Sequence, residues 1–567
     1  MKTSLLQHFE KAVEAPESVP AIRRLILDLA VRGKLAYQDA TEGSATDLLK
    51  KIDVERARLK IKACTPDVPG PFEIPSNWAW AALRRVTTDR GQRTPEKRFL
   101  YIDVSSVDKE KGTVATPQIV DAESAPSRAR KRVAQGDVIY SCVRPYLLNI
   151  AIIDKHFDPE PIASTAFAVL DGLGFINPKY LWMVLRSPFF IDQVERKMRG
   201  QAYPAINDRD LAALPIPIPP LEEQNRIAKN LDALLVLCDD LEVALQKRER
   251  RRDRLVAASL HALSDGDSAG PGTSPSFQDS ARFYFNHLPR LTTRPEHVCQ
   301  LRRSIIDIAV RGIIVRQIAS EEHSADLLRG LRARQAAETR PRKYLPDIAQ
   351  GDAPFAIPET WSWVPLQNLL NGDTQNGFSR RPDEDPSGIP LLRISAGTIR
   401  KDWVVAEEEH KLTSGIDEDL RARFELKKGD LLACRFNGNR ESVGRLTIFK
   451  DYSGLRPIYP DKLIRVRLYG EFTIPALIRY FLNSSKMRVV IEQYCETTVG
   501  NWGISATDLK RIPVPVPPIE EQRRILARVD ELLSLCSELQ ASVDDGIEGR
   551  QKLLESALND ALHHGQC

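Results

Sequence analysis

The chain has 567 residues, of which 42% are hydrophobic and 28% are charged, a balance that argues against a disordered protein. Its length predicts three or four structural units, since a domain holds roughly 100 to 200 residues. The formal net charge of +4 excludes a uniformly basic polymer-binding protein, so any nucleic-acid-binding face must come from local clusters of charge.

No run of the sequence approaches the roughly 18 uninterrupted apolar residues that cross a bilayer, and the N-terminal stretch MKTSLLQHFEKAVEAPE lacks the apolar core of a secretion signal. We therefore predict a cytoplasmic protein that does not enter a membrane. The eight cysteines are scattered without a C-x-x-C pair, and the histidines form no spaced ligand set. Neither a metal site nor a disulfide framework is expected.

The first predicted elements are helical. Apolar residues from Ile22 to Ala30 recur at helical spacing, and Gly33 is placed as the C-terminal cap of that helix. A second helix is predicted from Ala45 to Ile61, after which a group of prolines marks a boundary near Phe72. From there to Pro220, short β-rich runs alternate with turn residues, which predicts a compact mixed domain that is mostly sheet.

The run PIPIPP from Pro215 to Pro220 ends this domain. Because proline cannot donate a hydrogen bond to a sheet, the run predicts an edge strand or a polyproline-like exit. A long helix is predicted directly after it, since prolines fit a helix start and Glu222 and Glu223 complement the positive end of the helix dipole.

The same series of elements returns later in the chain. LRRSIIDIAVRGII, FAIPETWSW and PVPVPPIEEQ repeat IRRLILDLAVRGKL, FEIPSNWAW and PIPIPPLEEQ of the first half. The offset grows from 279 (301 − 22) to 298 (513 − 215), so the second copy contains extra residues. We predict a tandem duplication of an α+β unit. Its expected segments are 1–71 and 291–353 (helical), 72–220 and 354–518 (mostly β), 221–263 and 519–567 (long helices), and 264–290, a Gly-, Ser-, Asp- and Pro-rich flexible linker.

Both long helices carry an apolar seam with coiled-coil spacing. The seams step by 4, 3, 4, 3 and 4 residues in the same register in both copies. A single amphipathic helix packed on its own domain is the alternative, but two matching seams favour pairing with each other. The seam residues are Ile227, Leu231, Leu234, Cys238, Leu241 and Leu245, and Ile525, Val529, Leu532, Cys536, Leu539 and Val543.

A helix over 221–262 would be about 60 Å long, roughly two turns of B-DNA. Two related domains separated by such rods would suit two short DNA sequences with unread bases between them. The loops of the two domains differ while the surrounding scaffold repeats, as two domains that read different half-sites would require. Arginine can bind guanine with two hydrogen bonds, and asparagine or glutamine can do so with adenine. The candidate DNA-binding residues are Tyr140, Ser141, Arg144, Tyr146, Asn149, Gln201 and Tyr203, and Arg435, Asn437, Asn439, Arg440, Asn501 and Trp502.

The motifs FxIPxxWxW and GDxxxxxxR are followed by a run of alternating prolines that we call the proline ladder (PIPIPP or PVPVPP), and then by EEQ and a heptad helix. This order of motifs resembles the specificity subunit of type I restriction–modification systems over nearly the whole chain. The resemblance implies two target recognition domains, each reading half of a split double-stranded DNA sequence. They would be related by pseudo-twofold symmetry and separated by antiparallel coiled-coil helices.

The same resemblance implies partners and their cofactors. Two methyltransferase subunits that use S-adenosylmethionine would bind the helices and methylate adenine at N6, and restriction subunits that use ATP and Mg²⁺ would translocate and cleave the DNA. No cofactor is expected on this chain itself.

Two other classes of function make different demands on the sequence. An enzyme would need a phosphate loop, a dinucleotide fingerprint or the Asn-Pro-Pro-Tyr type of methyltransferase motif, and the sequence contains none of them. We therefore predict a non-catalytic subunit. A coiled-coil scaffold that binds proteins without DNA specificity is the remaining alternative, and a steep loss of DNA affinity with salt would argue against it.

Overall fold

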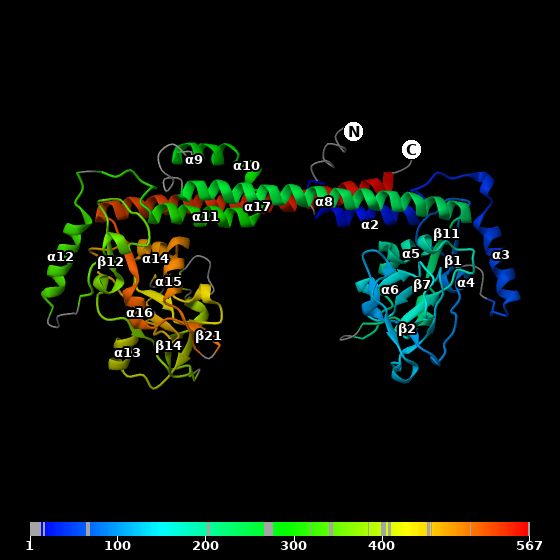
Figure 1. Cartoon of the computed structure of the whole chain (residues 1–567), viewed down its shortest axis with the longest axis horizontal. Coiled ribbons are helices and arrows are strands. Elements are labelled where there is room, and N and C mark those ends of the chain that lie inside the picture. Colours follow the sequence, from blue (N-terminus) through cyan, green and yellow to red (C-terminus); the bar gives the residue numbers. More distant parts are fainter. Residues whose placement is uncertain are drawn as a thin grey trace. The chain divides into compact units, whose positions relative to one another are not determined.

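The computed structural model describes residues 13–14, 17–63, 69–200, 204–265, 276–318, 320–338, 344–383, 385–397, 404–405, 410–450, 454, 456–498 and 500–564. The chain divides into two compact units, residues 1–250 with 547–567 and residues 251–546. Helix α8 (Leu221–Asp265) begins in the first unit and ends in the second, whereas α17 (Ile519–His564) begins in the second and ends in the first. The expected mixed fold, with two β-rich domains and two long helices, is confirmed (Figure 1).

The first unit starts with two helices, α2 (Ser18–Val31) and α3 (Ala45–Arg58). The Ser44 side chain caps α3 by accepting a hydrogen bond from the Asp47 amide at 3.3 Å. Gly33 follows α2 with φ +71°, and a Cβ at this position would lie 2.4 Å from Pro75 Cγ. Only glycine satisfies both the left-handed backbone and the close approach, which confirms its expected place after the helix.

Each β-rich domain is closed by its first and last strands. In the first unit β1 (Ala79–Ala82) pairs antiparallel with β11 (Pro215–Ile218), so the proline ladder is an edge strand of a two-stranded sheet. In the second unit β12 (Ser362–Pro365) pairs in the same way with β22 (Pro513–Val516). The edge-strand interpretation is confirmed in both copies.

The rest of the first domain consists of two sheets with short helices packed against them. One sheet has the strand order β10-β7-β8-β4-β3 and the other β5-β2-β9-β6. The strands are β2 (Phe99–Ile102), β3 (Val107–Asp108), β4 (Thr113–Val114), β5 (Gln118–Val120), β6 (Ala129–Arg132), β7 (Val138–Ser141), β8 (Ile150–Ile152), β9 (Pro161–Ser164) and β10 (Phe167–Leu170), and the helices are α4 (Leu83–Val86), α5 (Pro178–Arg186), α6 (Pro188–Glu195) and α7 (Asp208–Ala212).

The strands of the second domain are distributed over its sheets in a different way from those of the first domain. Its sheets have the orders β13-β19-β16-β18, β17-β21-β20 and β14-β15. The strands are β13 (Gln375–Asn376), β14 (Ile389–Leu392), β15 (His410–Thr413), β16 (Leu431–Cys434), β17 (Phe436–Asn437), β18 (Leu446–Ile448), β19 (Leu463–Val466), β20 (Glu496–Thr498) and β21 (Asn501–Gly503), and the helices of this unit are α9 (Phe277–Asn286), α10 (Leu288–Leu291), α11 (Pro295–Val310), α12 (Ser324–Ala336), α13 (Glu418–Phe424), α14 (Pro475–Asn483), α15 (Ser485–Gln493) and α16 (Ala506–Arg511).

The expected linker at 264–290 needs correction. Residues 277–286 form α9 and residues 288–291 form α10, while 266–275 lie outside the described residues. The physical reason is an amphipathic pattern in FQDSARFYFN that the flanking Gly, Ser and Pro residues obscured. Its Tyr284 has no exposed surface and joins the same apolar cluster as α11.

The two seams pack mainly within their own copies. The seam of α8 shares one core with α2 and the first β-rich domain. On α17, Ile525 and Val529 belong to the core of the second domain, whereas Leu532 and Cys536 pack with α11 and with the C-terminal part of α8. The long helices therefore do pack together in the second unit. The expected packing of the long helices is confirmed there, and the seam residues also contact the apolar faces of α2 in the first unit and of α11 in the second.

A buried carboxylate ties each long helix to its own domain. Glu223, in the first turn of α8, has no exposed surface and accepts hydrogen bonds from Gln38 Nε2 at 2.7 Å, Trp78 Nε1 at 3.0 Å and Asn77 Nδ2 at 3.2 Å. Glu521 of α17 is equally buried and accepts from Gln317 Nε2 at 2.6 Å.

Ion pairs reinforce this junction at equivalent positions. Arg226 pairs with Glu42 in the first copy, and Arg524 pairs with Glu321 in the second. The offsets match those of the repeat, 298 for the arginines (524 − 226) and 279 for the glutamates (321 − 42). We call the hydrogen bonds of Glu223 and Glu521, together with the ion pairs of Arg226 and Arg524, the helix junction. Within each unit, they fix the long helix to the helical segment that precedes the domain.

Among the described residues, no helix is long and apolar enough to cross a membrane.

Candidate nucleic-acid interface

The second domain brings its two candidate loops together. Strand β17 pairs antiparallel with β21, with Phe436 opposite Gly503 and Asn437 opposite Trp502. A Cβ on Gly503 would lie 2.5 Å from the Phe436 ring, so the tight pairing requires glycine. Residues from 435–440 and 501–502, separated by about sixty positions in sequence, therefore share one three-stranded sheet and its connecting loop.

Arginine and aromatic side chains alternate on this sheet. The Arg440 guanidinium lies over the Trp502 ring at 4.8 Å, and the Arg435 guanidinium lies over Phe436 at 4.7 Å. Lys462 approaches Phe436 at 5.0 Å. Stacked guanidinium groups keep their hydrogen-bonding edges available, which suits contacts to base edges or phosphates.

The backbone holds the candidate polar residues in defined positions. Arg440 Nη2 donates to the Glu492 carbonyl at 2.6 Å, and Arg435 Nη1 donates to the Asp461 carbonyl at 3.3 Å. The side-chain Oδ1 atoms of Asn437 and Asn439 accept hydrogen bonds from the backbone amides of Asn439 and Glu441, at 2.9 and 3.0 Å. Asn439, Arg440 and Asn501 are exposed, whereas the others are half-buried.

In the first domain, Arg144 and Tyr146 are exposed on a short 3-10 turn, Pro145–Leu147. The Arg144 amide donates to the Pro204 carbonyl at 2.8 Å, and Val143 forms a β-bridge with Ala205. The turn is thus fastened to the second candidate loop of this domain. Two predicted residues of that loop, Gln201 and Tyr203, lie outside the described residues.

Two predicted contacts in the first domain need correction. Tyr140 and Ser141 each have only 1% of their surface exposed, because β7 lies between β10 and β8 and is covered on both faces. Tyr140 packs in the main core, and the Ser141 hydroxyl donates to the Val143 carbonyl at 2.9 Å. Neither side chain is placed to reach DNA. Asn149, at the start of β8, is half-buried.

Several basic residues of the first unit form internal ion pairs. Arg90 pairs with Asp137 at 2.7 Å, and Arg85 pairs with Asp53 at 2.7 Å. Lys131 is 4% exposed and pairs with Asp89 at 2.6 Å. These residues support the fold of the domain rather than an outer surface.

Buried cysteines among the described residues include Cys142 and Cys434. Burial raises the pKa of the Cys142 thiol to about 12 and that of Cys434 to about 11, so both remain protonated thiols at neutral pH. The same residues include no group of three or more His, Cys, Asp or Glu that could hold a metal ion.

Sequence reasoning missed some residues of this face. Lys462 reaches Phe436 only because strand β19 runs beside β16, a pairing that no local pattern signals. Arg488 of α15 lies next to Arg440, to whose carbonyl its Nη2 donates at 3.4 Å, and it sits in an ordinary amphipathic helix.

Comparison with known proteins gives consistent matches. A family model described as the type I restriction modification DNA specificity domain matches residues 108–248. The specificity subunit of the type I restriction enzyme EcoAI from Escherichia coli is 27% identical over 579 residues, covering 96% of this chain and 93% of that protein. The EcoEI specificity subunit, also from Escherichia coli, is 25% identical over 572 residues with the same coverage of both chains, 96% and 93%. The crystal structure of an HsdS subunit from Thermoanaerobacter tengcongensis is 23% identical, covers 86% of this chain and 98% of that one, and has a TM-score of 0.43.

Proposed function

The chain belongs to the family of type I restriction–modification specificity subunits, the non-catalytic components of these enzymes, and we propose that its two β-rich domains each read one half of a split DNA target. The recognition domains would correspond to residues 72–220 and 354–518. The observation that carries the proposal is the contrast between a repeated scaffold and different exposed loops. The helix junctions are alike, whereas one domain exposes Arg144 and Tyr146 and the other Arg440 beside Trp502.

The chemistry of both loops supports contact with DNA. Exposed arginines bind guanine edges or phosphates, and exposed asparagines bind adenine edges. In the second domain Arg435, Asn437, Asn439, Arg440, Asn501 and Trp502 would form the reading surface. In the first domain Arg144, Tyr146 and Asn149 would do so, together with Gln201 and Tyr203.

The long helices would dock two methyltransferase subunits. Helix α8 exposes Val236, Leu237 and Val243 with 57, 61 and 64% of their surfaces accessible, and α17 exposes Leu535 with 51% accessible. Leu237 and Leu535 occupy equivalent positions of the two copies (535 − 237 = 298). Exposed apolar residues at repeated positions suit one docking surface for each of two identical partners.

Catalysis would then belong to the partners. The methyltransferase subunits would bring S-adenosylmethionine for N6-adenine methylation, and restriction subunits would bring ATP and Mg²⁺ for cleavage. A complex that modifies chromosomal DNA works in the cytoplasm, where we place this chain.

A methylation map tests the proposal. The chain is expressed together with its methyltransferase subunit in a host that lacks adenine methylation, and genomic DNA is sequenced by a method that detects N6-methyladenine. We expect methylation at one split motif with two defined halves and a fixed number of arbitrary bases between them.

A chimaera sharpens this test. When residues 354–518 are exchanged for the second recognition domain of a relative, one half of the motif should change and the other should stay. A continuous motif would contradict the proposal. Complete absence of methylation in cells that contain the assembled complex would favour a protein-binding scaffold instead.

A further inference from the structure

Four arginines gather where α11 passes α15 and the start of β18. Arg488 of α15 is 6% exposed, and its Nη2 donates to the Arg440 carbonyl at 3.4 Å. Arg445 precedes β18, and its Nε donates to the Glu441 carbonyl at 2.7 Å. Arg303 of α11 is exposed and approaches Arg445 closely enough for the two charges to interact. We call Arg303, Arg440, Arg445 and Arg488 the arginine cluster.

Positive charge exceeds negative charge within this cluster. Burial, together with the neighbouring charges of Arg488 and Arg303, lowers the pKa of Arg445 to about 10. The carboxylates of Glu441 and Glu492 oppose this effect, and Glu492 pairs with Arg488 at 3.5 Å. The Nε and Nη1 atoms of Arg488 are buried and donate to no partner among the described residues. Such concentrated charge is stabilised when an anion binds beside it.

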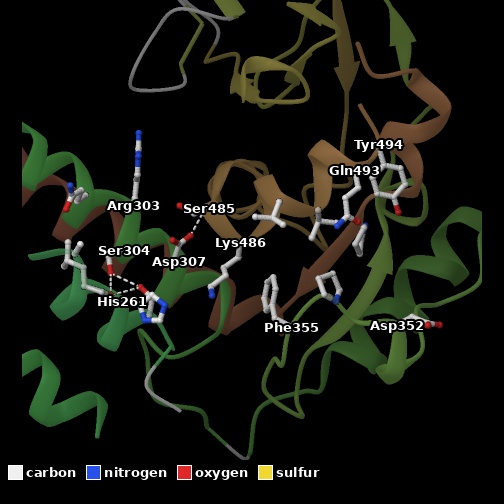
Figure 2. Close-up of a pocket in the computed structure, with 18 residues that line it drawn as sticks. His261, Arg303, Ser304, Asp307, Asp352, Phe355, Ser485, Lys486, Gln493 and Tyr494 are labelled. Carbon is white, nitrogen blue, oxygen red and sulfur yellow. Dashed lines mark hydrogen bonds between the residues drawn. The ribbon is translucent and has the colours of Figure 1, made fainter. Parts of the chain in front are cut away.

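The cluster is continuous with the proposed reading surface. Arg440 lies over Trp502 at one end, and Arg303 projects from α11 at the other. Arg303 lines a cavity of about 840 Å³ together with Lys486 and Asp307, and Figure 2 shows its side chain extending away from both of them. A polyanion bound at Trp502 would therefore pass the remaining arginines as it continues towards α11.

The first copy lacks the cluster although it keeps one member. Arg24 of α2 is exposed and equivalent to Arg303 (303 − 24 = 279). From the strands and helix caps, however, Asn149 stands at the place of Arg445, and Ile191 stands at the place of Arg488. Arg24 is therefore a matched control with the same residue type, helix position and exposure.

We propose that Arg303, Arg445 and Arg488 of the arginine cluster form a phosphate-binding site that holds the DNA backbone beside the half-site read by the second domain, without reading bases themselves, whereas Arg440 joins this site to the reading surface. This inference rests on the proposed function. Guanidinium groups pair with phosphate oxygens through two parallel hydrogen bonds, and several of them in a row follow successive phosphates. The site makes binding by the second unit more dependent on salt than binding by the first.

The test uses the complex with its methyltransferase and fluorescent duplexes that carry the mapped motif, the motif with one half altered, or neither half. Affinity is measured over a series of salt concentrations for the wild type, Arg303→Ala, Arg303→Lys and Arg24→Ala. Each phosphate contact contributes a slope of about −0.9 to log K against log salt, which corresponds to about eightfold in affinity at 0.1 M salt. Thermal unfolding of each variant verifies the fold.

We expect Arg303→Ala to lose about eightfold in affinity on all three duplexes, with a slope lower by about 0.9. Arg303→Lys should keep the slope, because the charge remains, and Arg24→Ala should stay close to wild type. Equal losses of affinity in Arg303→Ala and Arg24→Ala would overturn the inference. A loss of affinity in Arg303→Ala that is confined to duplexes with an intact second half-site would also overturn it, because it would indicate a base contact.

The proposed function can fail separately. A wild-type complex that binds all three duplexes equally would refute bipartite reading and still leave the effect of Arg303 measurable. A wild-type complex that binds none of them would remove both proposals.

Discussion

The helix junction is expected to decide how firmly the first β-rich domain is held, and Glu223→Ala tests this. The substitution removes an acceptor of three hydrogen bonds, from Gln38, Asn77 and Trp78. An unsatisfied buried donor costs about 1–3 kcal/mol. The donor of Trp78 is buried and would be left unsatisfied. Asn77 is half-buried, whereas Gln38 is exposed and can donate to water instead. We expect a loss of about 2–3 kcal/mol in the stability of the junction.

Hydrogen exchange of backbone amides measures this loss where it occurs, because a chain of several units does not unfold in a single step. The opening free energy of amides in β1 and β11 should fall by about 2–3 kcal/mol, while amides in β12 and β22 serve as the internal reference. Glu223→Gln keeps one acceptor oxygen, and Asn77 can rotate its amide to meet the new donor, so its effect should stay below about 1 kcal/mol. Unchanged exchange in β1 and β11, or equal damage by the two substitutions, would refute this account of the junction.

Four further predictions follow from the described contacts. Arg440→Ala should weaken methylation of targets through one half-site by about tenfold and leave discrimination at the other half unchanged, as measured with duplexes altered in each half. Burial raises the pKa of Glu223 above its usual value of 4.5, so its contribution to stability is full below that pH and declines as the pH rises through the raised pKa. The difference in opening free energy between wild type and Glu223→Gln, measured by hydrogen exchange in β1 and β11, should accordingly shrink between about pH 4 and about pH 8. Leu237→Glu should reduce binding of the methyltransferase subunit by at least about tenfold in sedimentation or calorimetry, without unfolding the chain, because the side chain is 61% exposed. Gly33→Ala should destabilise the first unit by about 1–3 kcal/mol in thermal unfolding, because the added Cβ meets Pro75 at 2.4 Å in a left-handed conformation.

Much of the fold could be predicted because its signals are local and repeated. The proline ladder at Pro215 restricts the backbone directly, and the long helix after it follows from periodic apolar residues. Because the unit is repeated, the sequence pattern of each of these elements occurs twice in the chain. The prediction of a flexible linker at 264–290 is wrong for residues 277–290, because the average composition of the segment conceals a short amphipathic helix. Tyr284 of that helix packs into a core whose other residues come from distant positions in the sequence.

The site was harder to predict because the chain contributes to it from distant positions. Arg440 and Trp502 were identified separately, and only the pairing of β17 with β21 joins them. Tyr140 and Ser141 were misplaced because a turn-rich neighbourhood suggests exposure, while their strand lies inside the sheet. Glu223 was interpreted as a partner of the helix dipole, yet its hydrogen-bond donors come from positions 38, 77 and 78.

The pairing of first and last strands in each domain has a consequence for how such a protein can change over generations. Because Ala79 lies opposite Ile218, and Ser362 opposite Val516, the chain enters and leaves each domain at the same place. Recombination at these two points would transplant a complete domain and leave the ends of the recipient's backbone where they were. If each domain reads half of a target, as proposed, one such exchange would change the preference for that half and leave the proposed docking helices unaltered.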